Sequence, residues 1–188
     1  MAFLPGFAGD RTGASAALAP AYRFARRAGP RLRSWLHSVD SELAARTGDT
    51  KRAIVETKRA GDALATLGSD PDWLDFYDPA RFASFAGYVQ LLAGDPQTAA
   101  LTLQNALAVL PSRGTKQRSV LLLDLATARA GSDPDYAVEL ASQAVNLLQV
   151  IWYPTAQDRL PALRNSLRAS PYREELEERL RPLSAMAS

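Results

Sequence analysis

Apolar side chains recur along this chain at spacings of three and four residues, which is the pattern of amphipathic α-helices. In residues 50–67, for example, the apolar stripe includes Ala53, Ile54, Ala60 and Leu67. Nothing alternates between apolar and polar at a spacing of two, so we expect no sheet. The pattern predicts helices over residues 14–28, 31–46, 50–67, 81–93, 96–110, 116–130, 135–149, 155–169 and 172–183. For the helix over residues 155–169, a start near Pro161 is the alternative.

Glycine and proline separate these helices and group them into pairs. Gly48 with Asp49, Gly94 with Asp95 and residues 131–134 form the turns inside the pairs, and Asp95 can cap the helix that follows it. Pro20 does not fit this pattern, because proline inside a helix removes a hydrogen bond and costs about 3 kcal/mol. The first helix is therefore expected to be kinked at Pro20 or to begin there.

Residues 81–111 form the most complete helix–turn–helix unit. Three small residues, Ala83, Ala86 and Gly87, lie on one face of its first helix, where a second helix can approach closely. A glycine turn, a stripe of alanine and leucine and a closing proline follow, in the order typical of tetratricopeptide (TPR) repeats. The turn glycines are 46 and 37 residues apart, compared with a TPR period of about 34. The excess is expected in the connecting loops.

The sequence therefore predicts an all-α fold, a TPR-like right-handed superhelix of antiparallel helix pairs. We assign residues 14–183 to a single domain of this kind. Residues 1–13 contain two Pro/Gly interruptions and are expected to form a partly ordered lead-in. Residues 184–188 are expected to be a disordered tail.

Composition excludes several classes of protein. The chain has no cysteine, which rules out disulfides, thiol catalysis and cysteine-ligated metals and is consistent with a cytoplasmic location. No segment approaches the roughly 20 apolar residues that span a bilayer, so we expect no membrane partner. Residues 1–60 hold eleven Lys and Arg against five Asp and Glu. We interpret this basic part as a solvated helical surface, with contact to nucleic acid as the alternative.

The loop over residues 68–78 is acidic and aromatic. We interpret it as a connection between repeats whose aromatic side chains fill the seam between helical pairs. A calcium-binding loop is the alternative, but an EF-hand needs glycine at its sixth position and glutamate at its twelfth. Counted from Asp70, these positions hold Asp75 and Arg81, so the calcium pattern fails.

No catalytic or cofactor-binding motif is present. His37 is the only histidine, and without a second histidine or a cysteine the common zinc sites cannot form. Helix spacing places His37 beside Asp40 and Ser41, which is ordinary surface spacing, and there is no nucleophile elbow. The glycine-rich phosphate-binding motifs are also missing. We therefore expect no enzyme activity, no cofactor and no metal.

What remains is a binding surface. In stacked TPR units, the first helix of each pair lines a concave groove that can receive a peptide or a small ligand. By repeat register, the groove should be lined by Trp35, Ser38, Glu42, Arg46, Arg81, Ser84, Tyr88, Arg118, Leu121, Leu125 and Arg129. Arginine and aromatic side chains are typical of binding hot spots. Arg46, Arg118 and Arg129 fit equally well at helix ends, where they would bind carbonyl groups.

Two stretches, residues 70–111 and residues 118–145 with the segment 159–168, resemble the C-terminal TPR region of actinobacterial helix-turn-helix transcriptional regulators. The resemblance implies a regulatory or sensor module that recognises a protein, a peptide or a small-molecule ligand. It also implies that DNA is bound only through a domain absent from this chain, because no helix-turn-helix is expected before residue 14. The alternative is a free-standing TPR scaffold or adaptor that associates with other proteins or forms a homodimer.

Overall fold

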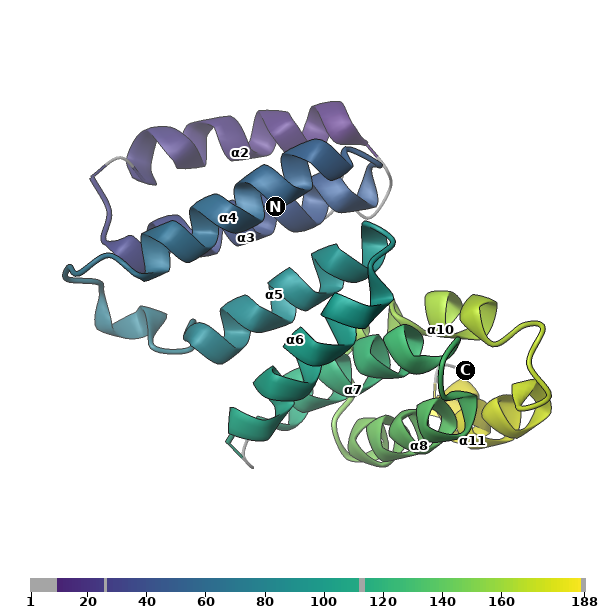
Figure 1. Cartoon of the computed structure of the whole chain (residues 1–188). Coiled ribbons are helices and arrows are strands. Elements are labelled where there is room, and N and C mark those ends of the chain that lie inside the picture. Colours follow the sequence, from purple (N-terminus) through teal and green to yellow (C-terminus); the bar gives the residue numbers. More distant parts are fainter. Residues whose placement is uncertain (1–9, 26, 112–113, 187–188) are drawn as a thin grey trace. The chain divides into compact units, whose positions relative to one another are not determined.

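A computed structural model describes residues 10–25, 27–111 and 114–186 of the chain (Figure 1). In these residues every regular element is a helix and there is no strand, which confirms the all-α prediction and the sequential antiparallel pairs. The elements are α2 (Arg11–Ala25), α3 (Pro30–Arg46), α4 (Thr50–Leu64), the short 3-10 helix η1 (Asp72–Leu74), α5 (Pro79–Leu92), α6 (Pro96–Val109), α7 (Thr115–Arg129), α8 (Pro134–Val150), α9 (Pro154–Gln157), α10 (Leu160–Ser166) and α11 (Arg173–Met186).

The chain divides into two compact units, Met1–Asp95 and Pro96–Ser188. Both units contain fully buried apolar side chains of their own, for example Leu74 and Leu163. Whether they act as one domain stays a prediction. No helix in the described ranges is long and apolar enough to cross a membrane.

Helix α3 is the central element of the first unit. It packs against α2, α4 and α5, and α5 also packs against α4. On one side Val39 and Leu43 of α3 form a core cluster with Ala14 and Leu18 of α2. Another cluster contains Leu74, Tyr77 and Phe85, and the half-buried Trp35 of α3 packs against both. Because α3 has neighbours on several sides, buried side chains occur around most of its circumference.

Two of the three predicted glycine turns adopt the left-handed conformation. Gly48 has φ 79° and Gly94 has φ 85°. At the first turn the Gly48 N–H donates to the Ala45 carbonyl and the Asp49 N–H to the Ala44 carbonyl, which is a Schellman motif. The carboxylate of Asp49 then accepts the N–H of Arg52 and caps α4.

The third turn, which has one extra residue, closes differently. The N–H groups of Ser132 and Asp133 both donate to the carbonyl of Arg129. The glycine at this turn does not have a positive φ. Asp133 still caps the following helix by accepting the N–H of Tyr136.

Helix α7 has the central position in the second unit. It packs against α6, α8, α9 and α10, while α11 packs against α8. Leucines from several of these helices are fully buried, and they include Leu103, Leu121, Leu123, Leu125, Leu140, Leu148 and Leu176. As in α3, buried positions lie on nearly every side of the helix.

The first helix starts earlier than predicted and does not begin at Pro20. Helix α2 begins at Arg11, inside the expected lead-in, and the Asp10 carboxylate accepts the N–H of Gly13 at this end. It continues through Pro20 without ending there. Ala16, whose carbonyl loses its helical partner, and Pro20 are both exposed, so water can satisfy that carbonyl. Residues 1–9 of the expected lead-in lie outside the described residues.

Other boundaries also differ. The helix expected over residues 155–169 is two helices, α9 and α10. Helix α10 begins at Leu160, which agrees with the alternative start near Pro161, and Pro161 lies in its first turn, where the missing N–H is tolerated. Helix α11 runs to Met186, beyond the expected end at residue 183, so residues 184–186 of the expected tail are helical. Residues 187–188 lie outside the described residues. Ile54 and Leu67, expected in the core, are exposed.

Candidate functional site

Helices α3 and α5 bring one pair of predicted groove residues together. The guanidinium of Arg46 lies 5.1 Å from the centre of the Tyr88 ring, which is the distance of a cation–π contact. The same guanidinium pairs with the Glu42 carboxylate at 3.0 Å. Arg46 and Glu42 are mostly covered, so these three side chains are held in fixed positions between the two helices.

Arg81 is a predicted groove residue on α5 whose guanidinium has no ion pair among the described residues. Its guanidinium lies 5.7 Å from the centre of the Phe85 ring. Asp78, three residues earlier, accepts the Arg81 backbone N–H at 2.7 Å and so caps α5. Within the described part of the chain, no carboxylate pairs with the Arg81 guanidinium. Arg81 can therefore bind an anionic group without first breaking an ion pair.

The other predicted residues of these two helices pack within the first unit. Ser38 and Ser84 are both buried, and the Ser38 hydroxyl lies 2.7 Å from the hydroxyl of Tyr77. Trp35 is half-buried, and its ring meets the edge of the Phe76 ring at 5.5 Å between centres. Ser38 thus takes part in the packing between α3 and the loop before α5.

In the second unit, the predicted groove residues of α7 make internal contacts. Leu121 and Leu125 are fully buried. Arg118 donates to the carbonyl of Leu110 at 2.9 Å, so it has the helix-end role that the sequence left open. Arg129 donates to the side-chain oxygen of Gln104 at 3.1 Å. A role of these residues in ligand binding stays a prediction.

A polar cluster that the sequence did not reveal joins α2, α3 and α4. We define it as Tyr22, His37, Asp40, Arg52 and Glu56. The Tyr22 hydroxyl donates to the Asp40 carboxylate at 2.7 Å, and Arg52 pairs with the same carboxylate at 2.8 Å. Nδ1 of His37 lies 2.7 Å from Oε2 of Glu56. Asp40 and Glu56 are buried, so these partners replace the water that the two carboxylates have lost.

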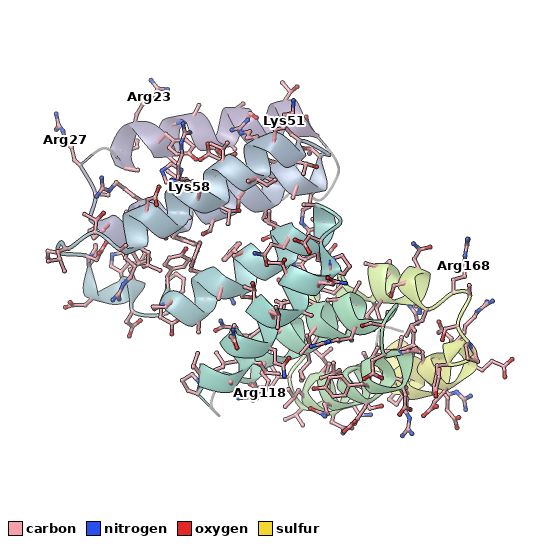
Figure 2. All side chains as sticks on the ribbon, viewed as in Figure 1. Arg23, Arg27, Lys51, Lys58, Arg118 and Arg168 are labelled. Atoms are coloured by element: carbon pink, nitrogen blue, oxygen red, sulfur yellow. The ribbon has the colours of Figure 1, made fainter. Side chains whose placement is uncertain are left out.

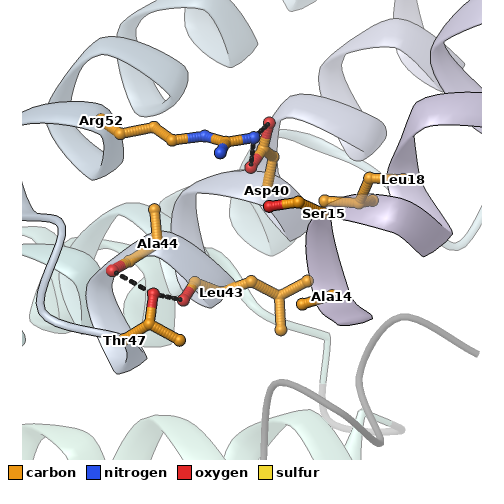
Figure 3. Close-up of a pocket in the computed structure, with 8 residues that line it drawn as sticks. All are labelled: Ala14, Ser15, Leu18, Asp40, Leu43, Ala44, Thr47 and Arg52. Atoms are coloured by element: carbon orange, nitrogen blue, oxygen red, sulfur yellow. Dashed lines mark hydrogen bonds and ion pairs between the residues drawn. The ribbon is translucent and has the colours of Figure 1, made fainter. Parts of the chain in front are cut away.

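The environment of Tyr22 raises the pKa of its hydroxyl well above the ordinary value. Burial is the largest cause, and the hydrogen bond to the Asp40 carboxylate adds to it, because both disfavour a tyrosinate. A cavity of about 10 Å³ lies beside the cluster, between the first turns of α2 and α4 and the last turn of α3 (Figure 3). Its walls include Asp40 and Arg52. A space of this size holds one water molecule and no larger ligand.

His37 occupies a different environment from the one expected. Its spacing to Asp40 and Ser41 predicts an ordinary surface position, but its ring lies 5.4 Å from the Tyr22 ring and bonds to Glu56 of the next helix. Sequence spacing within α3 contains no signal for these contacts, because they come from helices on either side of α3.

Ion pairs within the first unit occupy the two carboxylates of the polar cluster. Arg52 and Arg59 bind the carboxylates of Asp40 and Glu56, so neither carboxylate is available to a ligand. The adjacent cavity, at about 10 Å³, is large enough for a single water molecule only. We therefore interpret the polar cluster as a structural element whose hydrogen bonds and ion pairs hold α2, α3 and α4 together.

Replacing Tyr22 by phenylalanine should change how stability depends on alkaline pH. The folded chain holds the Tyr22 proton more tightly than the unfolded chain, whose tyrosines titrate near pH 10. The free energy of unfolding should therefore fall as the pH rises above about 10. We expect a smaller fall for Y22F, measured by urea denaturation between about pH 8 and 12. Y136F, outside the cluster, is the control, and parallel curves for Y22F and wild type would contradict this role.

The second unit contains a buried ion pair. Nε of Arg159 lies 3.1 Å from Oδ1 of Asp124, and both side chains are almost completely covered. Arg159 also pairs with the half-exposed Asp158 at 3.2 Å. The pair connects α7 to the start of α10, since Arg159 precedes α10 directly.

Comparisons with protein-family models, curated proteins and solved structures found no match to this chain. The described side chains also include no group of three or more histidine, aspartate and glutamate residues arranged to hold a metal ion. The fold itself defines the class of protein, an all-α protein of sequential antiparallel helix pairs.

Proposed function

We propose that this chain is a non-catalytic binding module built from TPR-like helix pairs. It receives a protein, a peptide or a small ligand along helices α3 and α5. The observation that carries this proposal is the direct packing of α3 against α5, which are the first helices of successive pairs. In TPR proteins, neighbouring first helices form the concave surface that binds the ligand.

The side chains on α3 and α5 favour a ligand with an anionic group. Arg81 offers a guanidinium that no carboxylate neutralises within the described residues. Arg46 and Tyr88 already contact each other, so little side-chain entropy is lost when a ligand binds beside them. A carboxylate on the ligand can accept two parallel hydrogen bonds from the Arg81 guanidinium.

The biological setting that we propose is transcription regulation. The support is the sequence resemblance of residues 70–111 and 118–145 to the TPR region of helix-turn-helix regulators. In this setting the chain senses the ligand, and a DNA-binding domain absent from this chain contacts the operator. Ligand binding then changes regulation through the TPR surface and not through a chemical reaction.

Arg81→Ala should weaken the binding of acidic peptides at least tenfold. A hydrogen bond to a charged group contributes about 1.5–3 kcal/mol, and this variant removes a bidentate one. The probe is a library of fluorescein-labelled acidic peptides with free C-terminal carboxylates, measured by fluorescence anisotropy. Lys51→Ala is the control, because Lys51 is an exposed cation of the same unit that is not a predicted groove residue.

Two results would count against the proposal. Equal affinity of R81A and wild type for the selected peptide would move the binding site away from α3 and α5. A wild-type chain that binds no peptide at about 1 mM would exclude acidic peptides as ligands, since such affinities are worth less than roughly 4 kcal/mol.

A further inference from the structure

One end of the first unit carries several large apolar side chains that face solvent. Here the connection between α2 and α3 lies against the loop that follows α4. A side chain on Gly68 would meet Pro30 at 2.6 Å, and one on Gly29 would meet the Ser69 carbonyl oxygen at 2.2 Å. The Asp70 carboxylate fixes the contact by accepting the N–H groups of Arg31 and Leu32, at 3.0 and 3.1 Å.

The apolar part of this end is large for a protein surface. Phe24 is 83% exposed, Leu67 98%, Trp73 60% and Phe76 49%. Since an aromatic side chain can bury about 150–250 Å², these fractions leave on the order of 500 Å² of apolar surface. A patch of this size is at the upper end for a monomer and marks an interaction site. It approaches the roughly 800 Å² that each partner contributes to a standard interface.

Charged side chains of both signs accompany the apolar ones. Arg23 and Arg27 extend into solvent where α2 ends (Figure 2). Asp72 and Asp75 are exposed next to Trp73 and Phe76 in the sequence. In the ranges that the structure describes, none of these four side chains has a hydrogen bond or ion pair.

The acidic residues of the loop fall into two groups. Asp70 and Asp78 accept backbone N–H groups at the starts of α3 and α5, so helix capping accounts for them. Asp72 and Asp75 cap neither helix. Arg23, Arg27, Asp72 and Asp75 are therefore two cations and two anions without an ion pair in the described ranges, and they accompany the apolar side chains of this end. We call the surface formed by Arg23, Phe24, Arg27, Leu67, Asp72, Trp73, Asp75 and Phe76 the end surface.

We propose that the end surface is a homodimer interface, at which a second copy of this chain binds through a two-fold axis. In a two-fold interface the same patch occurs on both sides, so the arginines of one copy can face the aspartates of the other. The apolar side chains then meet in the centre and the charges lie at the rim. A strongly acidic partner would be repelled by Asp72 and Asp75 and a strongly basic one by Arg23 and Arg27, whereas a second copy can pair both kinds of charge.

The proposal is independent of the ligand surface, because none of its eight residues is a predicted groove residue. A charge exchange tests it. The R23E/R27E variant turns the end surface wholly acidic and D72K/D75K turns it wholly basic. Sedimentation equilibrium of the full chain should show a dimer for wild type at tens of micromolar. Each variant alone should be monomeric, with a dissociation constant at least tenfold weaker, because like charges now face each other.

The mixture of the two variants is the decisive sample. Acidic and basic end surfaces attract at both charge contacts, so an equimolar mixture should restore a dimer that contains one copy of each. The matched control exchanges charges elsewhere on the same unit, with K51E/K58E, and should leave the wild-type dimer unchanged. Circular dichroism checks that each variant keeps its helices.

Three results would overturn the proposal. If the wild-type chain is monomeric up to about 100 µM, the end surface is not a homodimer interface and its partner would be a different protein. Variants that dimerise as well as wild type would place any dimer interface elsewhere. A mixture that stays monomeric would show that the arginines and aspartates do not face each other across a two-fold axis.

Discussion

Tyr77→Ala should destabilise the first unit by about 3–5 kcal/mol, the range for removing a buried aromatic side chain. Tyr77 is completely buried, and Leu74 and Phe85 pack around its ring. Its hydroxyl lies 3.0 Å from the hydroxyl of Ser34 and 2.7 Å from that of Ser38. The alanine variant leaves a cavity and also leaves these two buried serines without their partner.

Two neighbouring variants separate the causes. Y77F keeps the ring and removes only the hydroxyl, so it should cost about 1–2 kcal/mol. F76A changes the adjacent aromatic side chain, which is about half exposed, and should cost much less than Y77A. Urea denaturation followed by circular dichroism measures all three. A loss below about 1 kcal/mol for Y77A would mean that the Tyr77 ring does not hold α5 and the loop against α3.

The second large effect is expected at the buried ion pair of the second unit. Asp124→Ala leaves the guanidinium of Arg159 buried without its main partner, and changes of this kind cost about 3–5 kcal/mol. The pair to Asp158 remains, so the loss should lie at the lower end of that range. Urea denaturation is again the measurement. Because the chain has two compact units, the loss should appear in the transition of the second unit if the two transitions separate.

A double variant tests whether the charge is the cause. D124L/R159M replaces the pair by apolar side chains of similar size and should recover most of the stability lost in D124A. Equal losses in D124A and in the double variant would instead indicate that the ion pair itself contributes net stability.

The helices and their pairing were predictable because local features determine them. Gly48 and Gly94 adopt the left-handed conformation that ends a helix, and Asp49 caps the next helix as its position suggests. The spacing of apolar residues then gives the helices between the turns. These signals lie within a few residues of one another, so one sequence is sufficient to read them.

The burial of polar residues was not predictable from the same signals. Asp40, Glu56 and Asp124 read as surface residues in a helical pattern, yet all three are buried. Their burial depends on how many helices surround α3, α4 and α7, and helical periodicity carries no information on that number. The prediction that Ile54 is buried was wrong for the opposite reason. Its position on α4 faces no neighbouring helix, so the side chain remains exposed.

The predicted ligand surface could be predicted from the sequence only in part. The register placed Arg46 and Tyr88 on successive first helices, and the structure brings them into contact. The repeat register did not predict the hydrogen bond between the hydroxyls of Ser38 and Tyr77, because the loop that contains Tyr77 has no regular period. Of the predicted residues on α3 and α5, Arg81 and Trp35 keep exposed surface together with the types of side chain that dominate binding.

The buried polar side chains of α3 also disfavour incorrect pairing of the helices. A chain assembled from similar helix pairs can exchange one amphipathic helix for another during folding. If the leucine-rich α7 took the place of a neighbour of α3, the buried carboxylate of Asp40 and the hydroxyl of Ser38 would lose their partners, at about 1–3 kcal/mol each. Apolar side chains alone would accept many neighbours. The charged and hydroxyl groups of α3 find their hydrogen-bond partners in α2, α4 and the loop before α5. They therefore favour packing of α3 against these native neighbours.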